Sequence, residues 1–349
     1  MLGVRIGNYT IVEKIGEGGM GTVYRAAHET LGRSAAVKML SPESARDDEM
    51  VARLFNEARS ATAIPHPGIV EIYDFGFLPD HTAYIIMELL EGESLAGKLR
   101  REGGVPHRRA LEIVRAVCRT LHVAHEHGII HRDLKPENIF LVPDPEMPAG
   151  ERVKLLDFGI AKGAEEPLHH ALTETGVVMG TPPYMSPEQC RGAAMIDRRT
   201  DLYALGCVLY ELLCGRPPFS ARSAGEIIAH HLYFRPRSPR EHDPRIPRAV
   251  EDLVLWLLQK NPDRRPGTAA QVAAAIDEIA IGDGPLDRAV IASMDTMPTL
   301  TSAISPPVAP PSAALTLRQV CDRRRRTARQ GCRRRVRRTR NARSSNLDP

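Results

Sequence analysis

Apolar and polar residues alternate with a period near two over much of the first ninety positions, a pattern that is typical of β-strands. Bounded by glycine, proline and polar residues, these runs predict strands over residues 9–15, 22–27, 35–40, 70–77 and 83–89. Residues 48–63 instead carry apolar side chains at helical spacing, and this run ends before Pro65. The N-terminal part is therefore predicted to be a small sheet with one helix.

From about residue 92 the apolar period changes to 3.6, which predicts helices over residues 108–127, 201–213, 250–258 and 268–280. Thr268 with Gln271 three positions later forms a capping-box pattern at the start of the last helix. Beyond residue 282 the pattern gives way to a sequence rich in Pro, Ser and Thr. The fold class is α+β, and the predicted parts are a sheet lobe at 1–87, a helical lobe at 88–282, a flexible linker at 283–317 and a disordered tail at 318–349.

The composition fits a globular protein of roughly two domains, with 349 residues, 42% of them hydrophobic and 26% charged. The six cysteines include no Cys-x-x-Cys pair, so neither a disulfide framework nor a zinc site is indicated. The longest apolar run, residues 202–214, contains Glu211 and is shorter than the roughly 20 residues that span a bilayer. No secretory signal pattern is present at the N-terminus. A cytoplasmic protein without a transmembrane segment is expected.

A glycine-rich segment, Gly16-Glu-Gly18-Gly-Met-Gly21-Thr-Val23, lies between the first two predicted strands. A glycine hairpin with little side-chain bulk can close over phosphate groups, whereas a dinucleotide-binding turn would join a strand to a helix. The alternative is an ordinary hairpin, since glycine serves any tight turn.

Lys38 lies on the third predicted strand, fifteen residues beyond Val23, where its ammonium could reach phosphate oxygens. A lysine at a strand end is more often simply solvated. Glu57 on the following helix is placed to pair with Lys38, and the two residues together favour the phosphate-binding interpretation.

The strongest signal is the eight-residue segment His131-Arg-Asp-Leu-Lys-Pro-Glu-Asn138, followed nineteen residues later by Asp157-Phe-Gly. A hydroxyl nucleophile needs a carboxylate that orients it and accepts its proton, and a triphosphate needs a divalent cation held by oxygen ligands. Asp133, Asn138 and Asp157 supply these groups. A chance polar loop does not account for the order of the residues and the spacing together.

On these motifs, residues 9–280 resemble a eukaryotic-type protein kinase, most closely the bacterial Ser/Thr kinases of that superfamily. The resemblance implies the bilobal kinase fold, with ATP and Mg²⁺, or alternatively Mn²⁺, bound between the lobes. It implies that Asp133 is the catalytic base, that Asn138 and Asp157 hold the metal, and that Lys135, Lys38 and Glu57 complete the catalytic set. Met87 would be the gatekeeper, and the other ATP-binding residues would be Ile15, Gly16, Gly18, Gly21, Val23, Ala36, Lys38, Glu88, Leu90 and Phe140.

The same resemblance covers Gly180-Thr181-Pro-Pro-Tyr-Met-Ser186-Pro-Glu188, the expected end of an activation loop. Ser186 stands where the family usually has alanine. The resemblance implies that Glu188 pairs with Arg265 and that Asp201 braces the catalytic loop. Thr181, as a residue of the P+1 loop, together with Lys135 resembles the branch specific for serine and threonine.

Arg132, directly before Asp133, could bind a phosphate group on the activation loop through its guanidinium. The spacing of Thr173 and Thr175 resembles the autophosphorylated threonine pair of bacterial kinases, and both are predicted to be phosphorylated. The alternative is that both threonines are merely solvated.

The C-terminal tail is strongly basic. Residues 318–349 hold 13 Arg and 2 Asp, whereas the preceding residues carry 34 basic and 41 acidic groups. Such a polycation can bind nucleic acid or anionic lipid through phosphate contacts. The alternatives are a solvated extension and a sequence altered by a change of reading frame near Leu317.

The sequence thus predicts a bacterial Ser/Thr protein kinase whose partners are ATP and protein substrates. A pseudokinase scaffold is the alternative from another class, and the complete set of motif residues disfavours it. A homodimer that permits autophosphorylation is compatible with the sequence, which identifies neither the substrates nor the activating signal.

Overall fold

The computed structural model describes residues 1–18, 21–158, 182–192 and 196–281. All of them belong to the first of two compact units, residues 1–300. The predicted linker and basic tail lie outside the described residues, as do Gly159, Thr173, Thr175 and Thr181.

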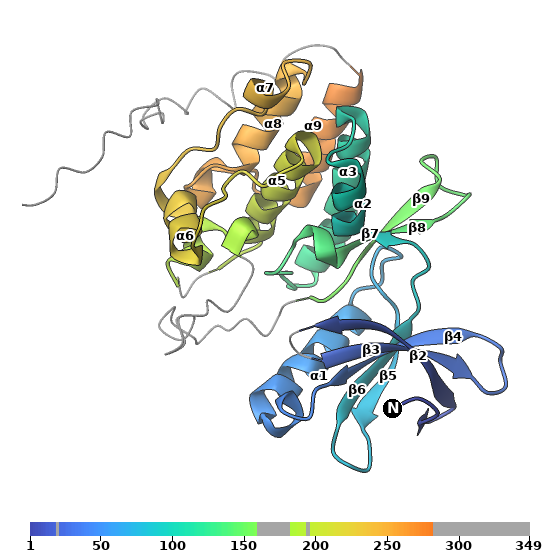
Figure 1. Cartoon of the computed structure of the whole chain (residues 1–349). Helices are drawn as coiled ribbons and strands as arrows, with labels where there is room; N and C mark the ends of the chain where they lie inside the picture. Colours follow the sequence, from blue (N-terminus) through green and yellow to red (C-terminus); the bar gives the residue numbers. More distant parts are fainter. Residues whose placement is uncertain (19–20, 159–181, 193–195, 282–349) are drawn as a thin grey trace, which may run out of the picture. The chain divides into compact units, whose positions relative to one another are not determined.

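The N-terminal lobe is built on an antiparallel six-stranded sheet of order β1-β2-β3-β4-β6-β5 (Figure 1). Its strands are β1 (Arg5–Ile6), β2 (Tyr9–Gly18), β3 (Gly21–His28), β4 (Ser34–Leu40), β5 (Ile72–Phe77) and β6 (Ala83–Glu88). All five strands expected from the alternating pattern are present, and the sequence did not predict β1. The short β1 escapes a periodicity argument because two residues show no repeat.

Helix α1 (Asp48–Ala63) covers one face of this sheet. It begins at Asp47, whose carboxylate accepts hydrogen bonds from the backbone N–H groups of Glu49 and Met50. Its buried residues Leu54 and Ala58 pack with Leu40, Ala83 and Ile85 of the sheet. Helix α1 has the bounds that the sequence predicted, because its cap and the proline beyond its end are both local signals.

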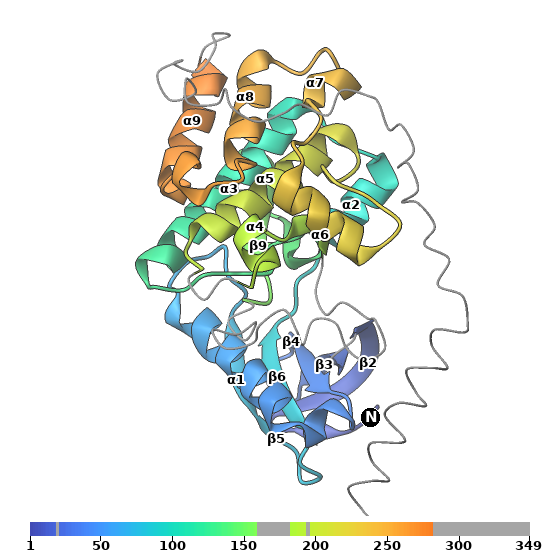
Figure 2. The same cartoon turned by 90° about the vertical axis from the view of Figure 1, so that its left-hand side faces the viewer.

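The C-terminal lobe is mainly helical. It contains α2 (Leu95–Glu102), α3 (His107–Glu126), α4 (Pro187–Cys190), α5 (Arg199–Cys214), α6 (Ala224–Tyr233), α7 (Pro239–His242), α8 (Arg248–Leu257) and α9 (Ala269–Ile281). A small sheet of β7 (Glu93–Ser94), β8 (Ile139–Pro143) and β9 (Glu151–Leu155) lies beside them. The predicted α+β class with a sheet lobe and a helical lobe is confirmed (Figure 2).

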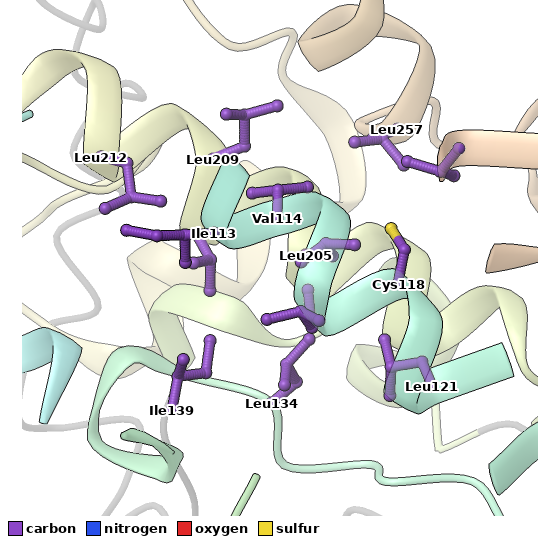
Figure 3. Packing of buried hydrophobic residues seen from close by; sticks show 14 of the residues in the cluster. Ile113, Val114, Cys118, Leu121, Leu134, Ile139, Leu205, Leu209, Leu212 and Leu257 are labelled. Atoms are coloured by element: carbon purple, nitrogen blue, oxygen red, sulfur yellow. The ribbon is translucent and has the colours of Figure 1, made fainter. Parts of the chain in front are cut away.

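Helices α3 and α5 form the centre of the C-terminal core (Figure 3). Ile113 and Leu121 of α3 pack with Leu205 and Leu209 of α5, and all four are essentially inaccessible to solvent. Leu134 and Ile139, on either side of the predicted metal ligand Asn138, belong to the same cluster. The catalytic-loop segment is therefore anchored by apolar burial on both sides of its polar residues.

Two features of the C-terminal lobe differ from the sequence prediction. Helices α2, α4, α6 and α7 and the strands β7, β8 and β9 were not predicted, because they contain too few residues to show a period clearly. The predicted capping box at Thr268 is altered: the Thr268 hydroxyl accepts from the Gln271 backbone N–H, but the Gln271 side chain accepts from Gly267. Within the described ranges, no helix combines the length and the apolar character needed to cross a membrane.

Candidate active site

Lys38 connects the two lobes through its ammonium group. Its Nζ atom lies 2.9 Å from Glu57 Oε1 on α1 and 2.9 Å from Asp157 Oδ1, just beyond β9. The neighbours Val37 and Met39 are buried in an apolar cluster of the sheet. Because successive side chains of a strand point to opposite faces, this burial directs Lys38 to the face that carries α1.

The three charges shift one another's protonation equilibria. Burial acts to lower the pKa of Lys38, but the charges of Asp157 and Glu57 outweigh it, so this pKa is raised. Burial and then the charge of Asp157 raise the pKa of Glu57 to about 8. Burial would also raise the pKa of Asp157, but Lys38 holds it near 2. Asp157 is therefore the carboxylate of this group that stays ionised.

Asp201 fixes the backbone of the catalytic-loop segment from α5. Its two carboxylate oxygens accept the backbone N–H groups of His131 and Arg132, each at 2.8 Å. A further bond joins Asp201 Oδ2 to His125 Nε2 at 2.8 Å, and the Asp201 side chain is fully buried. Arg132 has a φ of 63°, a left-handed conformation that a residue other than glycine adopts at a cost. The two bonds to Asp201 stabilise this turn.

Asp133 lies at the centre of the predicted catalytic residues. Its Oδ2 atom is 2.9 Å from Lys135 Nζ, and its backbone carbonyl oxygen accepts a hydrogen bond of 2.9 Å from Asn138 Nδ2. Because the amide nitrogen of Asn138 makes this contact, its Oδ1 atom lies in the same amide plane but points away from the Asp133 carbonyl oxygen. The predicted base and a predicted metal ligand are thus held within one short loop.

The donor set of this region suits a hard divalent cation. Asn138 contributes an amide oxygen and Asp157 an ionised carboxylate, which are the oxygen ligands that Mg²⁺ prefers. Among the described residues there is no group of three or more His, Cys, Asp and Glu side chains that could hold a metal ion. A cation at Asn138 and Asp157 would therefore need other oxygen ligands, such as phosphate oxygens.

The residues predicted to bind ATP lie on adjoining strands of the N-terminal sheet and where the chain passes into the C-terminal lobe. In the β2–β3 hairpin Gly16 pairs with Val23 and Gly18 with Gly21, while the tip, residues 19–20, lies outside the described part. Ala36 of β4 is opposite the predicted gatekeeper Met87 of β6. The other predicted residues are Ile15 on β2, Glu88 at the end of β6, Leu90 two residues after it and Phe140 on β8.

Gly21 has a structural role that the motif did not indicate. A Cβ atom at this position would lie 1.9 Å from the Met39 carbonyl oxygen of β4. A Cβ atom at Gly18 would meet nothing within 4 Å. Gly21 is therefore required for the close approach of β3 to β4, whereas the packing of the described residues leaves room at Gly18.

The ion pair between Lys154 and Glu88 was not predicted from the sequence. Lys154 Nζ contacts Glu88 Oε2, and Glu88 Oε2 also accepts a hydrogen bond from the backbone N–H of Glu71 at 3.3 Å. Lys154 is 9% exposed, although it lies on the short strand β9 just before Asp157. The one signal for a buried lysine in the sequence was its place within an otherwise apolar run. Its partner Glu88 could not be identified, because it lies 66 residues away.

The activation-loop end has the expected pair. Arg265 Nη1 and Nη2 donate to the two carboxylate oxygens of Glu188 at 2.7 and 2.8 Å. Ser186 is fully buried and caps α4 reciprocally with Gln189. This capping box explains why a small residue with a hydroxyl group suits position 186.

Arg132 presents a polar side-chain atom without a partner among the described residues. Its Nε atom is buried and makes no hydrogen bond within the described structure, while its carbonyl oxygen accepts from Gln189 Nε2 at 2.8 Å. The predicted phosphorylation sites Thr173 and Thr175 and the predicted P+1 residue Thr181 lie outside the described residues. Their roles remain predictions.

The comparison with known proteins agrees with this geometry. The family described as the protein kinase domain matches residues 9–275. The serine/threonine-protein kinase PknB of Mycolicibacterium smegmatis is 39% identical over 280 residues, which are 79% of this chain and 44% of the relative. The serine/threonine-protein kinase pkn3 of Myxococcus xanthus is 42% identical over 274 residues, which are 78% of this chain and 50% of the relative. The chain thus spans about half the length of these curated relatives or less.

A solved structure shows the same fold. The kinase domain of Mycobacterium tuberculosis PknI is similar to this chain with a TM-score of 0.63 and 29% identity, covering 81% of this chain and 99% of the other. The match includes both the sheet lobe and the helical lobe.

Proposed function

The chain belongs to the protein kinase family, and we propose that it transfers the γ-phosphoryl group of Mg-ATP to serine and threonine hydroxyls of proteins. The observation that carries the proposal is the contact of Lys38 with both Glu57 and Asp157, at 2.9 Å each. This contact connects a lysine suited to phosphate with a carboxylate suited to a cation. The family uses ATP and a divalent metal, and Mg²⁺ fits the oxygen donors of Asn138 and Asp157.

In the proposed reaction Asp133 orients the acceptor hydroxyl group and accepts its proton as the oxygen attacks the γ-phosphorus, and the bond from the γ-phosphorus to the β–γ bridging oxygen breaks so that ADP leaves. Lys135, 2.9 Å from Asp133, faces the transferred group with a positive charge. Lys38, kept in place by Glu57, binds phosphate oxygens of ATP. When bound, Mg²⁺ would neutralise part of the negative charge on the phosphate groups.

The rest of the proposal follows the same family pattern. The adenine would lie against Val23, Ala36, Met87 and Phe140, with backbone groups near Glu88 and Leu90 at its edge. Phosphate groups on Thr173 and Thr175 would bind Arg132, whose buried Nε atom has no hydrogen-bond partner among the described residues and offers a donor. We further propose a cytoplasmic kinase of bacterial origin that phosphorylates itself, as a homodimer, and other proteins. Binding of nucleic acid or anionic lipid by the basic tail stays a proposal from the sequence.

The test is transfer of radiolabel from [γ-³²P]ATP and Mg²⁺ to the chain itself and to casein, with phosphoamino-acid analysis of the product. Label is expected on serine and threonine. Asp133→Asn should lower the rate by at least about 100-fold, because general base catalysis contributes on that scale.

The matched control is Asp263→Asn, which changes a carboxylate with 78% of its side chain exposed. Its rate should equal that of the wild type. Purified wild-type protein that labels neither itself nor casein would refute the proposed activity, and it would favour the scaffold alternative.

A further inference from the structure

A buried polar cluster lies beneath helix α6 in the C-terminal lobe, apart from the residues assigned to ATP and metal. Tyr203 of α5 and His231 of α6 are both completely buried, and the Tyr203 hydroxyl lies 2.9 Å from His231 Nδ1. Lys260 Nζ donates to the Tyr203 hydroxyl at 3.2 Å and to the His230 carbonyl oxygen at 3.3 Å. We call Tyr203, His231 and Lys260 the α6 cluster.

The directions of these hydrogen bonds follow from the chemistry of the three groups. In its protonated form the Lys260 ammonium group can only donate, so the Tyr203 oxygen accepts from it. The Tyr203 hydroxyl group then donates a hydrogen bond to His231 Nδ1. Burial lowers the pKa of His231 to about 3, so its ring is neutral and can accept in this way. The α6 cluster is thus a chain of hydrogen bonds from Lys260 through the Tyr203 hydroxyl to His231 of helix α6.

Helix α6 is the element that the cluster holds in place. It packs against the 3-10 turn Pro182–Tyr184 and against α4, which carry the end of the predicted activation loop (Figure 2). The backbones of Pro182 and Pro183 lie near enough to His231 to affect its pKa. A shift of α6 would therefore reach the turn that follows Thr181, the residue expected to face the substrate.

The cluster also meets the Glu188–Arg265 pair. The guanidinium carbon of Arg265 lies 4.8 Å from the centre of the Tyr203 ring, within the range of a cation–π contact. Lys260 Nζ lies 4.3 Å from the centre of the Phe219 ring. Through the Tyr203 ring and the Lys260 carbonyl oxygen, which accepts from Arg265 Nη2 at 3.2 Å, the cluster connects α6 to the structural pair at the same end of the activation segment.

Some groups around Lys260 lower its pKa, and others raise it. Burial lowers the pKa of Lys260 to about 7, and the cations Arg265 and Arg191 act in the same direction. The His230 carbonyl oxygen and the Phe219 ring favour the ammonium form. Burial raises the pKa of both neighbouring thiols, Cys190 and Cys207, so these remain neutral. Desolvating a lysine has a cost, and the contacts to the Tyr203 hydroxyl and the His230 carbonyl oxygen offset part of it.

We propose that Lys260 is a positioning residue for the protein substrate: through the Tyr203 hydroxyl and the His230 carbonyl oxygen it fixes α6 against Pro182–Tyr184. This inference rests on the proposed kinase function and adds a role in substrate binding that is separate from ATP binding. It assigns Lys260 no contact with ATP, metal or the transferred group.

The test is steady-state kinetics of Lys260→Met with a synthetic peptide of residues 167–183 of this chain as the acceptor. The KM for the peptide should rise roughly tenfold, because a hydrogen-bonded charged group is lost from the support of α6. The KM for ATP should stay within about twofold of the wild type. Amide hydrogen exchange of α6 should also become faster, a readout that needs no catalysis.

Arg115→Met is the matched control. It removes a partly buried cation that pairs with Asp277 between α3 and α9, so it loosens the C-terminal lobe without touching α6. Tyr203→Phe is the milder second variant, because it keeps the ring and removes the hydroxyl that connects Lys260 to His231. Its peptide KM should rise as well, and the double variant with Lys260→Met should add little further.

Each outcome decides a separate question. An unchanged peptide KM and unchanged α6 exchange in Lys260→Met would overturn the positioning role. The positioning role would also be overturned if Arg115→Met changed the peptide KM, the ATP KM and kcat as much as Lys260→Met does. Such a result would show that both variants only loosen the C-terminal lobe. Wild-type protein without any transfer would refute the proposed function instead, and the exchange experiment would still test the support of α6.

Discussion

Arg265 binds both carboxylate oxygens of Glu188 across 77 residues of sequence, and the guanidinium is fully buried. The remaining donors of Arg265 are used on backbone carbonyl oxygens of Gln259, Arg199 and Lys260. Thr200 donates a further hydrogen bond to Glu188 at 2.8 Å. The guanidinium nitrogens of Arg265 and both carboxylate oxygens of Glu188 all have hydrogen-bond partners. The pair therefore joins α4, the start of α5 and the segment before α9.

Glu188→Gln should destabilise the fold by about 3–5 kcal/mol, because it leaves the buried charge of Arg265 without its partner. Urea unfolding at pH 7, followed by circular dichroism, measures the change. Glu112→Gln is the control, since Glu112 pairs with Arg109 at the surface and its loss should cost less than about 1 kcal/mol. Equal stability of the two variants would contradict the importance of the buried pair.

The same pair predicts a pH dependence. Burial acts to raise the pKa of Glu188, but the hydrogen bonds and charge of Arg265 outweigh it, so the folded-state pKa is lowered from 4.5. The contribution of Glu188 to stability is therefore complete above about pH 4.5 and is lost as the pH falls through the folded-state pKa. The difference in unfolding free energy between wild type and Glu188→Gln should shrink from pH 6 toward pH 3. A constant difference across this range would refute the assignment.

Lys154→Met should weaken ATP binding, since it leaves the Glu88 carboxylate unpaired where the chain crosses between the lobes. A rise of about fivefold in the KM for ATP is expected from the loss of roughly 1 kcal/mol of coupling. The reversed pair, Lys154→Glu with Glu88→Lys, should recover part of the affinity because the opposite charges remain adjacent. A double-mutant cycle on ATP binding gives the coupling energy, and a value near zero would show that the contact has no role there.

Gly18→Ala and Gly21→Ala form a pair that separates phosphate binding from packing. Gly21→Ala must displace β3 from β4 and should cost about 1–3 kcal/mol of stability as well as ATP affinity. Gly18→Ala meets no described atom within 4 Å, so it should leave the melting temperature unchanged while raising the KM for ATP. Thermal unfolding together with ATP kinetics distinguishes the two variants, and a loss of stability in Gly18→Ala would contradict a role for Gly18 in phosphate binding alone.

Much of this architecture could be predicted from local signals. Helix α1 was bounded by a cap and a proline, and the residues of the 131–138 segment carried their chemistry in order. The long-range pairing of Glu188 with Arg265 was reached through the family resemblance rather than from periodicity, and the contact of Lys38 with Asp157 was not predicted. Sequence patterns record which face a side chain occupies but not which distant segment meets that face.

The remaining features depend on tertiary contacts that leave a weak trace in the sequence. The lysine in β9 could be seen, but its partner Glu88 could not be identified. Gly21 was read as a phosphate-binding glycine, and its close approach to Met39 follows only from the pairing of β3 with β4. In the same way, the sequence around Lys260 shows only a lysine near a helix end, and its contact with α6 is visible only in the fold.

Asp201→Asn tests whether the catalytic-loop turn depends on one buried carboxylate. Both oxygens of Asp201 accept backbone N–H groups, from His131 and Arg132, so an asparagine would turn its NH₂ group toward one of these donors. The left-handed conformation of Arg132 would lose a stabilising bond, and Asp133, the next residue, would move with it. We expect kcat to fall about 10–100-fold and the KM for ATP to change little, because the loss is confined to the turn that positions the base. Asp197→Asn, a change at a carboxylate with 54% of its side chain exposed, is the control and should keep wild-type kcat. A variant Asp201→Asn with wild-type kcat would mean that the apolar anchors Leu134 and Ile139 alone hold the loop in its active geometry.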